Sequence, residues 1–376
     1  MSKTIKALLA GVMLATTTIS NAQEANIPLA PESEQYQLEL ITKGVAIPWG
    51  MVWLNDKELL VSNRAGDLRL IRDGKLLDEP VKGVPEVHAK NQGGLLDLEI
   101  DPDYANNGWI YLSYSGYEGE GQGNNTSIMR ARLKDMALVD KELLFHGYPK
   151  TERVHHYGSR IEFDNEGYLF FTIGDRGQRD VHPQRLDHDP GKVHRIHSDG
   201  AIPESNPFVK TDNARPTIYS YGHRNPQGMA LHPVTGDIWT HEHGPRGGDE
   251  INIIKAGNNY GWPVITYGIN YNGTTITEQT TKEGMEQPIW RWTPSIAPSA
   301  MQFITGDKYP HWQGHLLVGS LKFAHLVLVE LDGNEVKGHS KWFEGIGRLR
   351  SMAVHPNGDL YLGTDGNGIY KVSYQP

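Results

Sequence analysis

A glycine-rich stretch from His241 to Trp262 holds the residues best suited to bind a cation. Its sequence, HEHGPRGGDEINIIKAGNNYGW, places Asp249 and Glu250 directly after a Gly-Pro-Arg-Gly-Gly bend, and a second tight turn begins at Gly257. Carboxylates and the carbonyl oxygens of bent backbone are the ligands that a hard cation such as Ca²⁺ takes in proteins. Gly and Asp are also ordinary turn residues. The stretch therefore predicts either a calcium-binding loop or two surface turns with an acidic pair.

Two adjacent histidines, His155 and His156, immediately precede an expected strand. Adjacent side chains of extended chain point in opposite directions, so at most one of the two is expected to face a site. A neutral imidazole can act as a general base near neutral pH, although a lone histidine is more often a hydrogen-bonded loop residue. Asp175, at the far end of the following hairpin, could orient the imidazole or could cap the turn in which it lies.

Several other loops carry cationic or amide side chains. The residues concerned are Arg224 with Asn225, Ser320 with Lys322, and Arg348 with Arg350. Alternation along extended chain puts the last two arginines on the same face. A single such cation is usually a solvated surface charge, but cationic loops at equivalent positions of a repeating fold favour a polyanionic ligand. Gln92, directly before Gly93 and Gly94, adds a polar group beside permissive backbone.

These loops lie between repeated strand pairs. An apolar strand, a turn with Asp, Asn, Pro or Gly, an aromatic-rich strand and a Gly recur along the chain. The repeats are Gly50 to Arg69, Leu95 to Tyr114, Ser159 to Gly177, Gly228 to Gly244, Ala300 to Ser320, and Ser351 to Asp365. Alternating patterns with this turn chemistry are typical of antiparallel strands. Six such units predict an all-β fold, a six-bladed β-propeller with inserted loops.

The two ends of the chain supply the strands that a closed propeller needs. Tyr36 to Ile41 and Gly368 to Tyr374 are single strand patterns, and their pairing in one blade would remove an exposed edge. A large sandwich or jelly roll is the alternative fold, but it does not account for six similar units. In a propeller, loops at one end converge on the axis, so residues far apart in sequence can share a pocket.

The first residues have the pattern of a targeting segment. Lys3 and Lys6 precede an apolar run, and small residues end at Ala22, so residues 1–22 are predicted to be a cleaved signal peptide. An uncleaved anchor is the alternative. The run is too short for a membrane-spanning helix. We expect residues 23–376 to form a single domain that is periplasmic or secreted.

The composition excludes several classes of function. The chain has no Cys, which excludes disulfides, thiolate metal sites and cysteine nucleophiles. A formal net charge of −9 argues against nucleic acid as a partner. No Gly-x-Gly-x-x-Gly motif follows a strand and opens a helix, so NAD is disfavoured.

A series of short motifs in a fixed order gives a more specific indication. They are Gln92 to Asp97, His156 to Arg160, Gly174 to Gly177, Gly222 to Gly228, Glu242 to Pro245, Asp249 to Asn252, Asn259 to Pro263, Ala297 to Ser299, Ser320 to Lys322, and Arg348 to Arg350. From about Trp49 to the C-terminus, the chain resembles the soluble PQQ-dependent aldose sugar dehydrogenases of the glucose/sorbosone dehydrogenase family. The fold of that family is a six-bladed propeller, in agreement with the repeats.

The resemblance implies a quinoprotein that oxidises aldose sugars at the anomeric carbon. His156 matches the general base, and Asp175 matches its supporting carboxylate. The positions expected to hold PQQ are Gln92, Arg224, Asn225, Tyr271, Ser320, Lys322, Arg348 and Arg350. The three carboxylates of PQQ would account for the cationic loops. The cofactor would carry the redox chemistry while the protein orients it and supplies the base.

The resemblance also implies two calcium ions. The backbone carbonyls of Gly244 and Pro245 match ligands of a Ca²⁺ that bridges PQQ and acts as a Lewis acid. Glu250 and Tyr260 match a second, structural Ca²⁺, with Asp249 as an additional candidate ligand. The expected partners are an aldose and an external electron acceptor (a quinone, a cytochrome or a dye), and the expected state is a monomer or a homodimer.

Two positions depart from the pattern of the glucose-oxidising relatives. His155 stands where these relatives tend to carry an acid, and Thr293 stands where some carry an aromatic residue. Both departures concern the choice of sugar. Two other classes of function stay open: a calcium-dependent propeller lactonase, which has no need of convergent cations, and a non-catalytic binding module, which has no need of His156 beside them.

Overall fold

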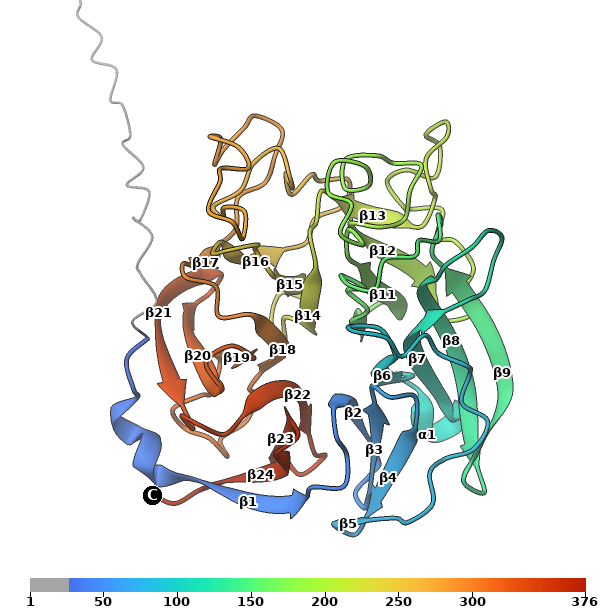
Figure 1. Ribbon diagram of the computed structural model, residues 1–376. Helices are drawn as coiled ribbons and strands as arrows, with labels where there is room; N and C mark the ends of the chain where they lie inside the picture. Colours follow the sequence, from blue (N-terminus) through green and yellow to red (C-terminus); the bar gives the residue numbers. More distant parts are fainter. Residues whose placement is uncertain (1–26) are drawn as a thin grey trace, which may run out of the picture.

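Six antiparallel sheets are arranged around a central axis in the computed structural model, which describes residues 27–376 (Figure 1). Each sheet has four strands, so the predicted six-bladed β-propeller is confirmed. The predicted signal peptide, residues 1–22, lies outside the described residues. No helix within residues 27–376 is both long and apolar enough to cross a membrane.

The blades follow the chain in order. The first two are β2 (Pro48–Asn55), β3 (Glu58–Asn63), β4 (Leu68–Arg72) and β5 (Lys75–Leu76), then β6 (Leu95–Ile100), β7 (Trp109–Gly116), β8 (Asn125–Lys134) and β9 (Ala137–His146). The next two are β10 (Ile161–Phe163), β11 (Tyr168–Ile173), β12 (Lys192–His197) and β13 (Ile218–Tyr221), then β14 (Pro226–Leu231), β15 (Ile238–Glu242), β16 (Asp249–Ile253) and β17 (Trp290–Trp292). The fifth is β18 (Pro298–Phe303), β19 (Leu316–Ser320), β20 (His325–Asp332) and β21 (Glu335–Trp342). Two short helices, η1 (Pro31–Gln35) and α1 (Tyr104–Asn107), complete the set.

The last blade closes the ring with strands from both ends of the chain. It contains β22 (Arg348–Val354), β23 (Leu360–Asp365) and β24 (Gly368–Tyr374), and its outer strand is β1 (Tyr36–Thr42). β1 pairs antiparallel with β24, with Tyr36 opposite Tyr374. The predicted pairing of the two terminal strands is therefore confirmed. Each of the predicted repeats begins with the two innermost strands of one blade.

Apolar side chains of neighbouring blades pack against one another between the sheets. In one such cluster Tyr36 of the closing strand stacks on Trp312, with 4.4 Å between ring centroids, and meets the edge of Trp342 at 4.8 Å. Aromatic pairs at these distances add to the stabilisation that burial provides. The cluster joins the fifth blade to the last one, so ring closure is secured by packing as well as by strand pairing.

The centre of the ring is held by one buried arginine. The guanidinium of Arg160 donates to the backbone oxygens of Trp49, Gln227 and Arg350, and it forms an ion pair with Asp97 at 3.0 Å. These partners lie on β2, β14, β22 and β6, the innermost strands of four other blades (Figure 1). Arg160 itself directly precedes β10. One side chain thus ties five blades together beneath the loops that carry His156 and Arg224.

Long connections depart from the regular blades where the site residues cluster. They follow β11, β12 and β16, and the last of these, drawn in orange, extends beyond the blades in Figure 1. Gly248, at the start of the β16 region, has a φ of +72°, and a Cβ there would lie 2.8 Å from the amide nitrogen of Gly268. The positive φ and this close approach both require glycine. Gly248 therefore lets the 244–248 bend lie against the long loop.

Candidate active site

Three adjoining cavities collect most of the residues predicted to do chemistry. The histidine cavity, of about 470 Å³, is bordered by His156, Asp175, Arg224 and Trp262. The cationic cavity, of about 1350 Å³, is bordered by Arg246, Lys322 and Arg348. Pro245 and Tyr271 border both, so the two cavities lie side by side. The third, the carboxylate cavity, is small and is bordered by Glu242, Glu250 and Tyr260.

His156 and Asp175 form a hydrogen-bonded pair. Nδ1 of His156 lies 2.7 Å from Oδ1 of Asp175, and the other carboxylate oxygen accepts from the indole of Trp262 at 2.8 Å. Because an ionised carboxylate only accepts hydrogen bonds, the imidazole proton lies on Nδ1 and Nε2 keeps a free lone pair. The histidine side chain is 14% exposed, and it borders the histidine cavity. The arrangement is that of an oriented general base.

The surroundings keep this pair in the neutral-imidazole, ionised-carboxylate state. Burial and the positive charge of Arg224 lower the pKa of His156 to about 4, although Asp175 opposes both effects. Burial would raise the pKa of Asp175, but His156 and Arg224 outweigh it and the pKa is lowered. The His156 imidazole is therefore held in its neutral form at neutral pH.

The backbone of His156 is held in an uncommon conformation. Its φ is +56°, in the left-handed region that few residues other than glycine adopt. The side-chain oxygen of Gln92 accepts from the His156 amide at 2.8 Å, and the Asn225 side chain accepts from the amide of Gly158. Two residues predicted to hold PQQ thus also fix the loop of the predicted base.

Arg224 lies at the junction of the histidine and carboxylate cavities. Its guanidinium donates to the carbonyl oxygens of His243 and Gly244 at 2.9 and 3.1 Å, and its own carbonyl accepts from the amide of Asp175. The Gly244 carbonyl is one of the two predicted calcium ligands. The other, that of Pro245, accepts no hydrogen bond from residues 27–376. The Pro245 carbonyl is therefore free to bind a cation, whereas the Gly244 carbonyl already accepts from the Arg224 guanidinium.

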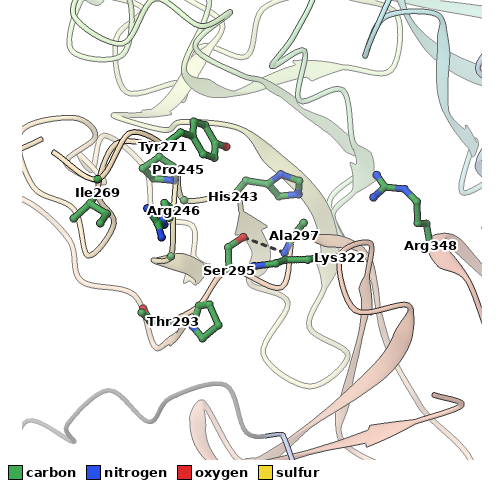
Figure 2. A pocket seen from close by; sticks show the side chains of 14 residues that line it. His243, Pro245, Arg246, Ile269, Tyr271, Thr293, Ser295, Ala297, Lys322 and Arg348 are labelled. Atoms are coloured by element: carbon green, nitrogen blue, oxygen red, sulfur yellow. Dashed lines mark hydrogen bonds between the residues drawn. The ribbon is translucent and has the colours of Figure 1, made fainter. Parts of the chain in front are cut away.

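The cations of the larger cavity come from three separate segments: the bend at Arg246, the turn after β19 at Lys322, and the start of β22 at Arg348. Figure 2 shows Arg246, Lys322 and Arg348 around the same space, with Tyr271 beside Pro245 and Arg246 and across the space from Arg348. Tyr271 is 72% exposed, so its ring is free to cover a ligand in this cavity. Three cations around a cavity of this size match an organic polyanion better than a neutral ligand.

Four predicted cofactor residues, Gln92, Asn225, Ser320 and Arg350, do not border any of these cavities. Arg350 is buried and forms a bidentate ion pair with Asp365, which also pairs with Arg348. Both arginines therefore meet the same carboxylate, as their shared face predicts. The hydroxyl of Ser320 donates to the carbonyl of Ile296 and accepts from the amide of Phe323. Ser320 and Arg350 support the loops that bring Lys322 and Arg348 to the cavity.

Glu250 stands out in the carboxylate cavity because few donors reach it. The only hydrogen bond to its carboxylate within residues 27–376 comes from the Asn252 side chain at 3.5 Å. Burial, together with the nearby charge of Glu242, raises the pKa of Glu250 to about 8. The carbonyl of Tyr260 accepts no hydrogen bond from the same residues, and its hydroxyl donates to the carbonyl of Ile253. Free oxygens around an uncompensated buried carboxylate suit a hard cation.

Asp249 is engaged elsewhere. One of its oxygens accepts from the amide of Gly244 at 2.8 Å, and the other accepts from the amides of Ile296 and Ala297 and from the Ser295 hydroxyl. Adjacent strand residues point to opposite faces, so Asp249 cannot share the cavity of Glu250. These donors use the lone pairs that a cation would need. We therefore leave Asp249 out of the ligand set and assign it to holding the loops together.

Sequence reasoning gave no individual role to three residues of the site. Trp262 and Glu242 lie within quoted motifs, but neither was singled out, because an indole and one carboxylate among many carry no signal of their own. Arg246 was treated only as part of a bend. Within residues 27–376 no three His, Asp or Glu side chains converge as a metal site, so bound calcium would depend on backbone carbonyls.

Comparison with known proteins gives a consistent result. The family model described as Glucose / Sorbosone dehydrogenase matches residues 45–371. The aldose sugar dehydrogenase YliI of Escherichia coli is 41% identical over 344 residues, which are 89% of this chain and 92% of that protein. The quinoprotein glucose dehydrogenase B of Acinetobacter calcoaceticus is 27% identical, over 96% of this chain and 92% of its own length.

Solved structures agree with these matches. The soluble aldose sugar dehydrogenase of Escherichia coli in its apo-form superposes with a TM-score of 0.85 at 38% identity, over 90% of this chain and all of that one. A PQQ-bound aldose sugar dehydrogenase from Streptomyces coelicolor superposes with a TM-score of 0.73 at 26% identity, over 92% of this chain and 99% of that one.

Proposed function

Because the chain belongs to the glucose/sorbosone dehydrogenase family, we propose that it is a PQQ-dependent oxidoreductase that converts aldoses to lactones at the anomeric carbon. The observation that carries the proposal is the adjacency of the His156–Asp175 pair and a cavity ringed by three cations. A base next to an anion-binding cavity suits an oxidation in which the protein removes a proton and a bound cofactor accepts two electrons. The relatives named for aldose and glucose oxidation support the same reaction class.

The cationic cavity fits the charge of PQQ. Arg246, Lys322 and Arg348 border it from separate segments, and PQQ carries three carboxylates. Guanidinium and ammonium groups bind carboxylates by charge-assisted hydrogen bonds. Tyr271 would cover the bound group, and Arg224 would meet it from the side of the histidine cavity, while Gln92 and Asn225 would hold the loop of His156 beside it. When bound, PQQ supplies the two-electron acceptor for the hydride of the sugar.

His156 would take the proton of the anomeric hydroxyl on Nε2. As the O–H proton leaves and the C1–H hydride departs, C1 and its oxygen become the carbonyl of the lactone. Asp175 holds the Nδ1–H, keeps Nε2 directed at the cavity and stabilises the imidazolium that forms. The low pKa of His156 keeps the imidazole unprotonated before the sugar binds.

Two groups of oxygens would hold calcium. Gly244 and Pro245 border the cationic cavity, and a cation held by their carbonyls would polarise a bound carbonyl group there. Glu250 and the carbonyl of Tyr260 would hold the second ion in the carboxylate cavity. An external quinone, cytochrome or dye would reoxidise the enzyme after export of the mature chain from the cytoplasm.

The test is reconstitution of the purified mature chain. Addition of PQQ and Ca²⁺ should produce aldose-dependent reduction of an artificial electron acceptor, and Lys322→Ala should weaken PQQ binding about tenfold by removing one charge-assisted contact. Lys337→Ala on β21, an exposed lysine far from the cavities, serves as the matched control. Failure of the wild-type chain both to bind PQQ and to oxidise any aldose would overturn the proposal.

A further inference from the structure

The indole N–H of Trp262 is directed at the carboxylate that holds His156. Nε1 of Trp262 donates to Oδ2 of Asp175 over 2.8 Å, and Oδ1 of the same carboxylate accepts from Nδ1 of His156 over 2.7 Å. Each oxygen therefore has its own side-chain donor. We propose that Trp262 is a positioning residue that sets the plane of the Asp175 carboxylate and, through it, the direction of the His156 imidazole.

The position of Trp262 is itself fixed on both sides of the residue. Its amide donates to the carbonyl of Gly222 at 2.9 Å, and its carbonyl accepts from the Gln184 side chain at 2.8 Å. The residue is 6% exposed, and the guanidinium of Arg224 lies 5.5 Å from the centre of its ring. Because the indole is fixed, its hydrogen bond restrains the orientation of the Asp175 carboxylate.

Asp175 needs a second donor because its own side chain leaves the carboxylate free to turn. The last torsion of an aspartate is broad, so one hydrogen bond to Oδ1 does not fix the carboxylate plane. The amide of Gly177 also donates to Oδ1, at 2.7 Å, which leaves Oδ2 to Trp262 alone among the residues that the structure describes. Removing the indole N–H would release the plane and let the imidazole tilt.

Trp262 also forms part of the wall between two cavities. It borders the histidine cavity with Asp175 and the carboxylate cavity with Glu250. The same chain segment carries Tyr260, two residues earlier. The indole that donates to Asp175 therefore also lines the cavity of Glu250.

Trp262→Phe tests the inference because it keeps an aromatic ring and removes only the N–H donor and some volume. Trp312→Phe is the matched control, since Trp312 is fully buried in the cluster at the closing blade, remote from the three cavities. Two measurements are made. The first is the proton NMR spectrum of the metal-free, cofactor-free chain, in which the Nδ1–H resonance of His156 is assigned by its loss in His156→Gln. The second is steady-state oxidation of an aldose by the PQQ-loaded enzyme.

For Trp262→Phe we expect the His156 Nδ1–H resonance to shift or broaden. We also expect kcat to fall about tenfold, the effect of losing one hydrogen bond to a charged group, while KM for the sugar and the affinity for PQQ change less than threefold. Trp312→Phe should leave the resonance and kcat unchanged. An unchanged resonance in Trp262→Phe would overturn the inference, whether or not activity falls, because a loss of activity alone would then reflect a merely structural role.

The kinetic arm rests on the proposed function, whereas the spectroscopic arm does not. A wild-type chain that oxidises no aldose would refute the dehydrogenase proposal and leave the resonance to decide the role of Trp262. A shifted resonance together with unchanged kcat would overturn the claim that the position of the imidazole matters for turnover. The two failures are therefore distinguishable.

Discussion

Asp175 and Glu250 are carboxylates in neighbouring cavities that share Arg224 and Trp262 as walls, yet the protein treats them in opposite ways. Asp175 accepts hydrogen bonds from His156, Trp262 and the Gly177 amide, and its pKa is lowered in spite of burial. Among residues 27–376, only the Asn252 side chain donates to the Glu250 carboxylate, at 3.5 Å, and burial beside Glu242 raises the pKa of Glu250 to about 8.

The difference separates two uses of a buried carboxylate. A group that must hold an imidazole in one orientation needs a constant charge, which fixed donors provide. A group that is to bind a cation must keep its lone pairs free, and without the cation it is costly to ionise. The fold therefore compensates the charge of Asp175 internally and leaves that of Glu250 to a ligand.

The largest effect is expected from breaking the internally compensated pair. His156→Ala should lower kcat by about 10² to 10⁴, the range for loss of a general base, while PQQ still binds. Asp175→Asn should lower kcat by about 10² or more, because an amide favours the wrong imidazole tautomer. Steady-state kinetics on the PQQ-loaded variants measures both. Normal turnover in the holo-fraction of His156→Ala, with only the cofactor lost, would assign His156 to binding.

The next largest effect is expected on calcium binding when Glu250 is changed. Glu250→Gln should weaken calcium binding to the carboxylate cavity by about tenfold or more, because it removes the one side-chain charge of the predicted ligand set. Calcium titration by calorimetry of the metal-free chain measures it. Asp249→Asn is the matched comparison, since the oxygens of Asp249 are occupied by protein donors and should not contribute. Equal losses in the two variants would return Asp249 to the ligand set.

Repetition and motif order made much of this architecture predictable. The six strand pairs and the terminal strands that close the ring follow from alternating patterns and turn residues, which are local signals. His156 and Asp175 were paired in the prediction, and they lie in hydrogen-bond contact. Both inferences depended on short sequence separations or on a repeat that fixes the topology.

The other features of the site depend on tertiary contacts between segments that are far apart in the sequence. Asp249 and Glu250 are adjacent in sequence, and side chains alternate between the two faces of β16. The structure is needed to show that Asp249 meets residues 295–297 and that Glu250 borders a cavity. The hydrogen bonds and ion pair of Arg160 require four partner residues from other blades, and no local sequence pattern predicts these partners. The role of Trp262 could not be predicted from the sequence either, because its indole meets Asp175 only when the fold brings the two blades together.

The stability of the metal-free chain should distinguish the two carboxylates by sign. Asp175→Asn replaces an acceptor with an amide that cannot serve both Trp262 and His156, and we expect a loss of about 1–3 kcal/mol. Glu250→Gln removes a buried charge next to Glu242, so at pH 8 it should melt no lower than the wild-type chain. Thermal unfolding of both variants in the presence of a chelator measures the contrast. A similar destabilisation by Glu250→Gln would mean that the protein does compensate Glu250.

The smallest expected effect is a pH dependence of calcium stabilisation. The folded-state pKa of Glu250, about 8, lies above the usual value of 4.5, so the folded metal-free chain holds a proton that the unfolded chain releases between these values. This contribution to stability is present below pH 4.5 and is lost as the pH rises toward 8. A bound cation replaces the proton, so calcium should stabilise the chain more at pH 8 than at pH 5.5. At a hundredfold excess over Kd, the expected rise in melting temperature at pH 8 is about 3 °C.

Scanning calorimetry at the two pH values, with calcium or with a chelator, provides the measurement, and Glu250→Gln is the control that should abolish the pH difference. A calcium effect of equal size at both pH values would show that the ion does not take the place of the Glu250 proton. It would then act mainly at the carbonyls of Gly244 and Pro245, which do not titrate. In that case the opposite pKa shifts of Asp175 and Glu250 would reflect burial alone, and the carboxylate cavity would not be a calcium site.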